Sequence, residues 1–294
     1  MLGPSGQASA FAGTGGPMRF GLNFTPVYPT EMAGLARLAE EVGFESLWIG
    51  EHVIVPFDGV PEGDRSNFRA NSRFVEPWVA LSNLAAVTTR VRLGTCVVVL
   101  PMHSPFHLAR AIATADVLSG GRISVGVGSG NIPAEYAAVG EEWATRGPRM
   151  DEMIAVLDVL FGDERPEFHG RFYDIPPSGF EPKPVQRPRP PLLIGGAGPA
   201  SFRRAVEAGD GWFGGTHSPA RAAELVGGLQ HRREELDKPP LEITLLTGWS
   251  AGYDPDLVGR YEAAGVDRLV VTPWTSSRAA REGIEQFAEA AGLG

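Results

Sequence analysis

A glycine-rich segment is the clearest candidate for a binding site in this chain of 294 residues. The predicted strand 192–195 leads into a segment suited to a tight turn: Gly195, Gly196, Ala197 and Gly198. Pro199 follows at a place that suits the first turn of a helix. Glycines let backbone N–H groups converge on an anion, and a helix N-terminus adds partial positive charge. The segment therefore predicts a phosphate site, with a plain strand-to-helix turn as the alternative.

Two polar residues, Glu51 and His52, follow the second predicted strand, 46–50. Barrel enzymes keep their catalytic groups at the carboxyl ends of their strands. A histidine gives or takes a proton near neutral pH, so His52 could protonate or polarise a substrate or cofactor atom. We take Glu51 and His52 as candidate catalytic residues, and a structural histidine is the alternative.

Two other strand ends suit the binding of a flat ring. The third predicted strand closes with an apolar wall and the fourth with glycines and an amide: Cys96, Val97, Val98 and Val99 in one, and Gly128, Ser129, Gly130 and Asn131 in the other. Glycines let the backbone approach a ligand closely, and Asn131 offers hydrogen bonds. Cys96 is the single cysteine, and its apolar surroundings predict a structural thiol rather than a nucleophile. Core and turn alone would also explain both segments.

The elements that would position these residues alternate along the chain. The predicted strands are 19–24, 46–50, 92–99, 123–128, 192–195, 211–213, 242–249 and 268–272. The predicted helices are 32–42, 78–88, 108–118, 150–161, 202–208, 220–236, 256–264 and 279–291. Strict alternation implies right-handed βαβ units, and eight of them predict an α/β fold, a (β/α)8 TIM barrel with insertion segments. The pattern does not show whether the eighth strand meets the first.

Three segments lie outside this alternation. Residues 1–17 are rich in Gly, Ser and Ala, so we expect a disordered leader before a single barrel domain over 18–294. The long loop 53–74 and the insertion at about 162–190 are expected near a barrel rim, where each could shape the pocket and set the substrate.

Composition narrows the range of partners. A net charge of −9 opposes binding to nucleic acid, which usually needs a basic face. The apolar runs are far too short to span a bilayer. A single cysteine fits a reducing compartment. We therefore expect a cytoplasmic protein that acts on a small molecule, with no nucleic-acid or membrane partner.

Taken in order, these pieces resemble the bacterial luciferase-like monooxygenase family, and more closely its branch that uses the deazaflavin coenzyme F420. The resemblance covers nearly the whole chain from Met18 onward. It depends on the segments 43–48, 51–52, 91–95, 118–122, 126–130, 180–186, 195–198 and 210–212.

The resemblance implies a cofactor site in a (β/α)8 barrel. In this family the cofactor ring packs against a bulge at the end of the third strand, often built with a non-prolyl cis peptide, which here falls within 96–99. The resemblance places His52 at the family's active-site histidine, 128–131 at the edge of the ring and 195–198 at the phosphate. F420-using relatives often carry a lysine after the next strand. The corresponding stretch 214–218 has none, so Thr216 and His217, or Ser218, would serve instead.

The expected function is hydride transfer between F420 and a small organic substrate, in a protein that the resemblance suggests is a homodimer. One alternative is an FMN-dependent monooxygenase, in which reduced flavin reacts with oxygen. Alternatives of other classes are a non-enzymatic flavin-binding protein and a barrel lyase with a metal held by Glu51, His52 and His103, although no metal is expected at the site. A Schiff-base lyase is disfavoured because Lys183 and Lys238 both lie beside prolines.

Overall fold

The computed structural model describes residues 16–58, 70–249 and 252–294, so most of the expected leader and the middle of the loop 53–74 lie outside the described residues. The barrel strands are β1 (Arg19–Asn23), β2 (Ser46–Ile49), β3 (Arg92–Thr95) with β4 (Val98–Val99), β5 (Ile123–Gly128), β8 (Leu192–Gly195), β9 (Gly211–Gly214), β10 (Glu242–Trp249) and β11 (Arg268–Thr272). The helices are α1 (Met32–Glu41), α2 (Pro77–Val87), α3 (Pro105–Ser119), α4 (Pro133–Val139), α5 (Arg146–Gly162), α6 (Pro199–Ala208), α7 (Pro219–Glu235), α8 (Pro255–Ala263) and α9 (Ala280–Ala291). Short 3-10 helices are η1 (Leu100–Met102), η2 (Trp143–Thr145) and η3 (Ser277–Ala279).

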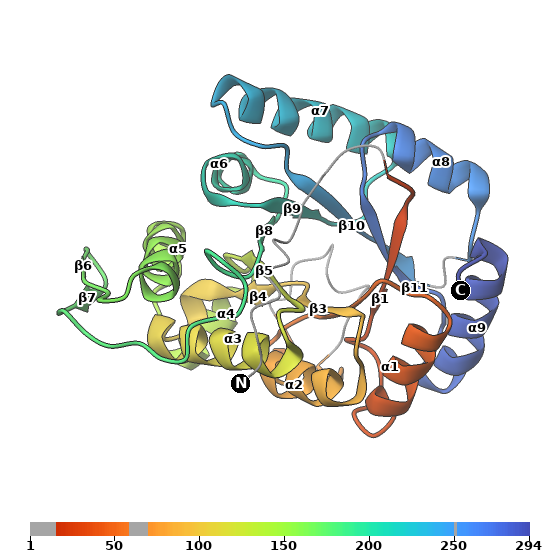
Figure 1. Cartoon of the computed structure of the whole chain (residues 1–294), viewed down its shortest axis with the longest axis horizontal. Helices are drawn as coiled ribbons and strands as arrows, with labels where there is room; N and C mark the ends of the chain where they lie inside the picture. Colours follow the sequence, from red (N-terminus) through yellow and green to blue (C-terminus); the bar gives the residue numbers. More distant parts are fainter. Residues whose placement is uncertain (1–15, 59–69, 250–251) are drawn as a thin grey trace, which may run out of the picture.

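The strands close into a parallel barrel, as predicted. β1 pairs with β2 on one side and with β11 on the other, so the last strand meets the first. The remaining neighbours follow chain order through β3 with β4, β5, β8, β9 and β10. Figure 1 shows the helices arranged around this ring in sequence order. The barrel therefore brings the carboxyl ends of all its strands to one end of the molecule.

The third strand is interrupted where the resemblance implied a bulge. β3 pairs with β5 at its start, and β4 resumes the parallel pairing with the same strand. Between them, the peptide bond from Cys96 to Val97 is cis. The prediction of one continuous strand over 92–99 is thus wrong at its middle, and the expected place of the cis peptide is confirmed.

Five helices start one to three residues earlier than predicted, and each has proline at its first position: α2, α3, α6, α7 and α8. Pro105 begins α3 and Pro199 begins α6, each three residues before the predicted start. Proline is tolerated there because the first N–H groups of a helix have no partner within the helix. Helix α4 was missed altogether, since its seven residues are too few to show a clear helical period.

The barrel interior is filled in layers. At the amino end, Arg268 is fully buried and pairs with Glu45 and Glu242. Above this network lies an apolar layer composed of Trp48, Leu193, Phe213 and Val270. Gly94 is needed beside it, because a Cβ there would lie 2.3 Å from the indole of Trp48. Beyond these filled layers, a cavity lies at the carboxyl end of the barrel.

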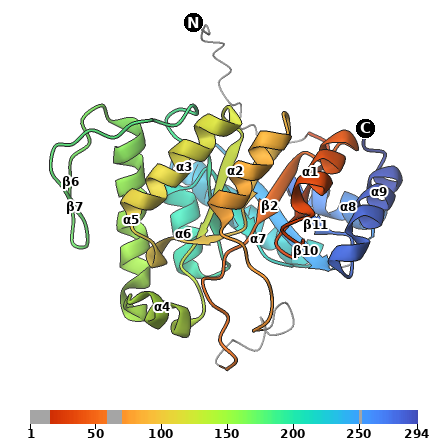
Figure 2. The ribbon, with the colours of Figure 1, turned by 90° about the horizontal axis from the view of Figure 1, so that it is seen from below.

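The insertion 162–190 does not lie at the cavity rim, contrary to the prediction. It connects the end of α5 to the start of β8, so it runs past the amino end of the barrel, opposite α4 and the loop after β2 (Figure 2). Its strands β6 (Phe168–His169) and β7 (Asp174–Ile175) form an antiparallel hairpin beside α5. Glu152 of α5 accepts hydrogen bonds from the backbone N–H groups of Arg171, Phe172 and Tyr173.

None of the helices in the described ranges is both long and apolar enough to cross a membrane.

Candidate active site

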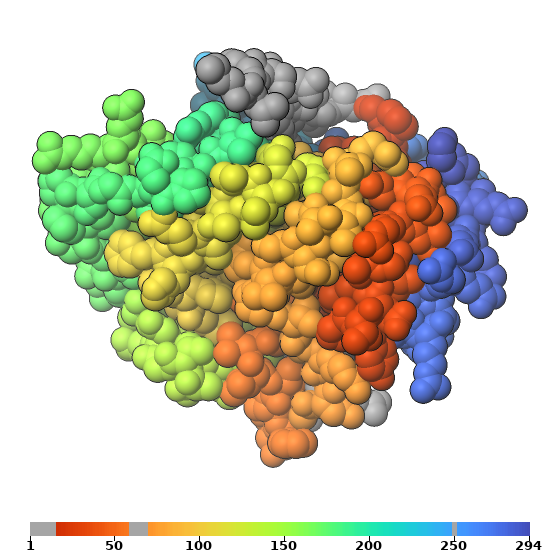
Figure 3. Space-filling view, turned by 60° about the horizontal axis from the view of Figure 1, so that its bottom comes forward, coloured from red at the N-terminus to blue at the C-terminus, as the bar shows by residue number. Residues whose placement is uncertain are grey.

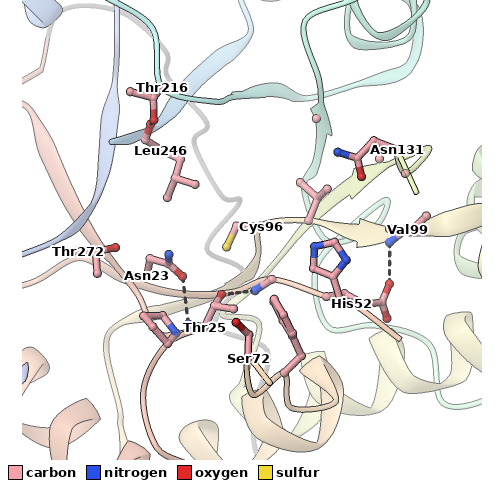
Figure 4. A pocket seen from close by; sticks show the side chains of 18 of the residues that line it. Asn23, Thr25, His52, Ser72, Cys96, Val99, Asn131, Thr216, Leu246 and Thr272 are labelled. Atoms are coloured by element: carbon pink, nitrogen blue, oxygen red, sulfur yellow. Dashed lines mark hydrogen bonds between the residues drawn. The ribbon is translucent and has the colours of Figure 1, made fainter. Parts of the chain in front are cut away.

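A cavity of about 790 Å³ opens at the carboxyl ends of the strands. Small-molecule and cofactor sites usually fall within this size range. Figure 4 shows polar side chains from several strands around it. The predicted site residues that line it are Glu51, His52, Cys96, Val97, Val99, Gly128, Ser129, Gly130, Asn131, Gly195, Gly196 and Thr216. Residues that were far apart in the sequence analysis therefore meet around one space.

Four predicted site residues lie outside the lining: Val98, Ala197, Gly198 and His217. Val98 is fully buried in the core outside the barrel, because side chains alternate along a strand and its neighbours Val97 and Val99 face the cavity. Ala197 and Gly198 are exposed residues on the turn that leads into α6.

The Val97 side chain forms an apolar shelf against the barrel wall. A Cβ on Gly128 would lie 2.9 Å from one methyl of Val97, and a Cβ on Gly195 would lie 2.9 Å from the other. These two glycines thus make room for Val97 in addition to lining the cavity. A flat apolar ring is the kind of ligand that such a shelf would suit.

Cys96 lies beside the shelf with its thiol hydrogen-bonded to the side chain of Thr25. Burial raises the pKa of the Cys96 thiol to about 12, and the hydrogen bond from Thr25 offsets only part of this. The residue therefore remains a neutral thiol near pH 7, which agrees with the structural role that the sequence favoured.

Glu51 supports the bend after the shelf. Its Oε2 accepts a hydrogen bond from the Val99 backbone N–H at 2.7 Å, and its Oε1 lies 2.8 Å from His103 Nε2. Burial alone would lower the pKa of His103, but the hydrogen bond and charge of Glu51, with the charge of Glu76, outweigh it and raise the pKa. Both carboxylate oxygens of Glu51 are thus bound to the protein, an arrangement that suits a positioning residue.

His52 lies at the cavity wall in a defined orientation. Its Nδ1 is 3.0 Å from Glu135 Oε2, and the other oxygen of Glu135 accepts from the Val53 backbone N–H at 2.9 Å. The ring also meets Phe74 edge-on, with 4.7 Å between centroids. Glu135 is buried on α4, the helix that the sequence analysis missed, so no signal marked it as a partner.

The glycine loop connects β8 to helix α6. Gly196 adopts φ +102°, and a Cβ there would lie 2.7 Å from Ser201 Oγ. The Trp212 indole N–H donates to the Gly196 carbonyl at 2.8 Å, and this hydrogen bond holds the loop in position. Helix α6 starts after Gly198, which has no side chain to cap it. The first N–H groups of this helix thus lie beside exposed backbone, where an anion would be stabilised.

The segment 214–218, which has no lysine, contains three polar residues with different contacts. Thr216 lines the cavity. His217 stacks on Trp212 instead, and its Nε2 has no hydrogen-bond partner among the described residues. Ser218 caps helix α7 by accepting from the Arg221 N–H. Burial, followed by the charge of Arg221, lowers the pKa of His217. Of these three residues, Thr216 alone lines the cavity, and its hydroxyl donates to the Leu246 carbonyl at 3.3 Å.

The groups needed for the lyase alternatives do not come together. Within the described ranges, no three His, Cys, Asp or Glu side chains are placed to hold a metal ion. Glu51 pairs with His103 while His52 pairs with Glu135. Lys183 donates to backbone carbonyls at the end of α5, and Lys238 donates to the Glu207 carbonyl.

Several cavity residues gave no signal in the sequence. Those from β1, β10, β11 and the loop before α2 include Asn23, Thr25, Tyr28, Ser72, Arg73, Thr247 and Thr272. Single polar residues after a strand are common in loops, so none could be selected by type. Their place at strand ends of a closed barrel was the available clue.

The sequence was compared with protein-family models and with known proteins. A model described as luciferase-like monooxygenase matches residues 9–257. The uncharacterized protein Rv0940c of Mycobacterium tuberculosis is 36% identical over 244 residues, covering 81% of this chain and 83% of that protein. The oxygenase component of a flavin-dependent trigonelline monooxygenase from Acinetobacter baylyi is 32% identical over 181 residues, covering 61% and 46%.

A solved F420-dependent secondary alcohol dehydrogenase, in complex with an F420–acetone adduct, shares the fold. Its TM-score is 0.77 at 20% identity, over 93% of this chain and 98% of that one. The family model spans most of the chain, and the fold and the order of the segments agree with it. The chain therefore belongs to the luciferase-like monooxygenase family.

Proposed function

We propose that this protein is an F420-dependent oxidoreductase that transfers hydride between the coenzyme and a small organic substrate. The observation that carries the proposal is the placement of the His52–Glu135 pair on the same cavity as the Val97 shelf and the glycine loop. A proton-transfer group, an apolar shelf and an anion site are the three features that such a reaction needs.

The described residues fit a phosphate-bearing ring cofactor. Val97 and Cys96 would support one face of the ring, and Gly128 to Asn131 would border its edge. Backbone N–H groups at Gly196 and at the start of α6 would bind the phosphate, because no lysine lines the cavity. When bound, deazaflavin supplies hydride chemistry at C5 of its ring, while the protein supplies orientation and electrostatics.

His52 would move the proton that accompanies the hydride. With the Glu135 carboxylate 3.0 Å away as acceptor, Nδ1 would carry a proton, and Nε2 would be the nitrogen that exchanges one with the substrate. At a carbon bearing a hydroxyl group, His52 would take the hydroxyl proton as the substrate is oxidised and return it in the reverse direction. Glu135 would hold the ring in position.

A flavin peroxide must be shielded from water, a demand that hydride transfer does not make. Among the described residues at the cavity, Gly196, Thr216 and Arg73 are exposed, which supports hydride transfer. The flavin-dependent relative from Acinetobacter keeps an FMN-dependent monooxygenase as the second candidate.

The two candidates separate by cofactor and by oxygen. Purified protein would be titrated anaerobically with F420 and with FMN, and binding followed by ring fluorescence. Oxidised F420 would then be mixed with a panel of secondary alcohols, and the absorbance of the deazaflavin followed. We expect tighter binding of F420, substrate-dependent bleaching, and loss of bleaching but not of binding in His52→Asn. Product formation that requires reduced FMN and oxygen would refute the proposal.

A further inference from the structure

Opposite sides of the cavity carry different kinds of donors. In the ring of strands, β1 and β8 are separated by three strands in either direction, so they face each other across the barrel. The glycine loop follows β8. Asn23 ends β1, and Tyr28 follows in the loop after it. A ligand bound by its phosphate at the glycine loop would therefore leave the β1 side for a second molecule.

Arg73 brings a positive charge to the β1 side. Its guanidinium lies over the ring of Tyr28, with 4.5 Å from Cζ to the ring centroid, and it lines the cavity. No carboxylate among the described residues pairs with it. Stacking uses the face of a guanidinium and leaves its in-plane N–H groups available for a planar oxyanion. Tyr28 is itself anchored, because its backbone N–H donates to Ser277 Oγ at 2.8 Å.

Asn23 offers a second donor from the same side. Its side chain is only 7% exposed, and its Oδ1 accepts from the Thr25 N–H at 3.0 Å. This bond orients the amide so that Nδ2 is the outward group, and no acceptor in the described ranges binds that nitrogen. Figure 4 shows Asn23 at the edge of the open space that Thr272 and Cys96 also border. Because Asn23 lines the cavity, a ligand or water there can supply the acceptor for Nδ2.

We infer that the cavity recognises a substrate carrying a carboxylate, with Arg73 and Asn23 as specificity-determining residues. Arg73 is the one permanent cation among the described lining residues, which matches a single negative charge better than a dianionic phosphate. Glu51 is the one carboxylate among the described lining residues, and its two oxygens are bound to Val99 and His103 rather than to Arg73. The inference depends on the proposed function only in assigning the β8 side to the cofactor.

The test uses a matched pair of probes, 4-fluorobenzoate and 4-fluorobenzamide, with binding followed by fluorine NMR in the presence of F420. These probes have the same shape and differ in charge. We expect the carboxylate to bind at least about tenfold more tightly than the amide, which corresponds to one charge-assisted hydrogen bond. Arg73→Gln should abolish this preference, and Arg73→Lys should restore part of it.

Arg171→Gln is the matched control, because Arg171 also stacks on an aromatic ring, that of Phe172, but lies on the hairpin outside the cavity. It removes the same charge and should leave the preference unchanged. Asn23→Asp keeps the acceptor for Thr25 and replaces the N–H donor with a negative oxygen, so it should weaken fluorobenzoate more than fluorobenzamide.

Equal binding of the two probes, binding of neither at millimolar concentration, or a preference that survives Arg73→Gln would overturn the inference. An F420 titration of Arg73→Gln identifies the source of the carboxylate. Unchanged F420 affinity supports a substrate group, whereas an equal loss for F420 would assign Arg73 to the coenzyme's own carboxylates and refute the substrate assignment. Failure of F420 to bind wild-type protein would contradict the proposed function, while probe discrimination measured without coenzyme would still stand.

Discussion

At the amino end of the barrel, charged side chains at the starts of strands bind one another, whereas at the carboxyl end donors face an open cavity. Arg268 pairs with Glu45 and Glu242, and Glu242 also pairs with Arg19. Burial would raise the pKa of Glu45, but Arg268 outweighs it and lowers the pKa to about 2. Arg73, in contrast, has no carboxylate partner in the described part of the chain. The comparison separates polar groups that hold the fold from polar groups that can bind a ligand.

The largest expected effect is at the amino end. Arg268→Met leaves Glu45 and Glu242 without their shared buried cation, so the free energy of unfolding should fall by about 3–5 kcal/mol. Urea denaturation would measure it. Arg203→Met is the control, because Arg203 is half-exposed and its ion pairs with Asp151 and Glu207 should contribute about 1 kcal/mol or less. An equal loss of unfolding free energy in both variants would show that the buried network stabilises the fold no more than exposed ion pairs do.

At the carboxyl end, Gly198 allows binding to be changed without loss of stability. Gly198 adopts extended φ and ψ values, and a Cβ there would meet nothing within 4 Å. Gly198→Asp should cap α6, which stabilises the helix, and repel a phosphate, so that the cofactor Kd rises by at least about tenfold. Gly198→Asn caps without the charge and should weaken binding less. Calorimetric titration and thermal unfolding would report both quantities. Unchanged Kd in the Asp variant would exclude this helix start as the phosphate site.

Glu135 tests whether a buried carboxylate near the cavity serves the fold or the chemistry. Glu135→Gln keeps the shape but can donate to His52 Nδ1, so the ring should no longer favour a proton on that nitrogen. We expect kcat to fall by about tenfold with little change in KM, and nitrogen NMR should show the altered tautomer. Glu141→Gln, which breaks an ion pair with Arg149, is the control. A lower stability with an unchanged tautomer would make Glu135 purely structural.

The smallest expected effect concerns His103. Its pKa is raised in the folded protein, so the stabilisation from its pairing with Glu51 is fully present below the pKa of the unfolded state. That stabilisation is lost as the pH rises through the folded-state value. The difference in unfolding free energy between wild type and His103→Asn should therefore be larger at pH 5.5 than at pH 8. A difference that grows with pH would contradict the assigned pairing.

Sequence patterns predicted the barrel well because buried parallel strands and amphipathic helices follow simple periods. They predicted residues at strand ends, such as His52 and Gly195, since the closed barrel gathers all such ends. They could not predict Glu135, which meets His52 across 83 positions of the chain. They misplaced the insertion 162–190 because the length of a connection does not tell at which end of a barrel it lies.

The position of the β6–β7 hairpin has a practical consequence. It projects beside α5, at the left of the space-filling view in Figure 3. It contributes no residue to the lining of the cavity. Glu152 holds its turn through three backbone hydrogen bonds, so the tip is fixed in place. A fluorophore, an affinity handle or a surface linker attached at this tip would lie away from the residues that line the cavity. The same site would allow the protein to be immobilised without blocking the carboxyl end of the barrel.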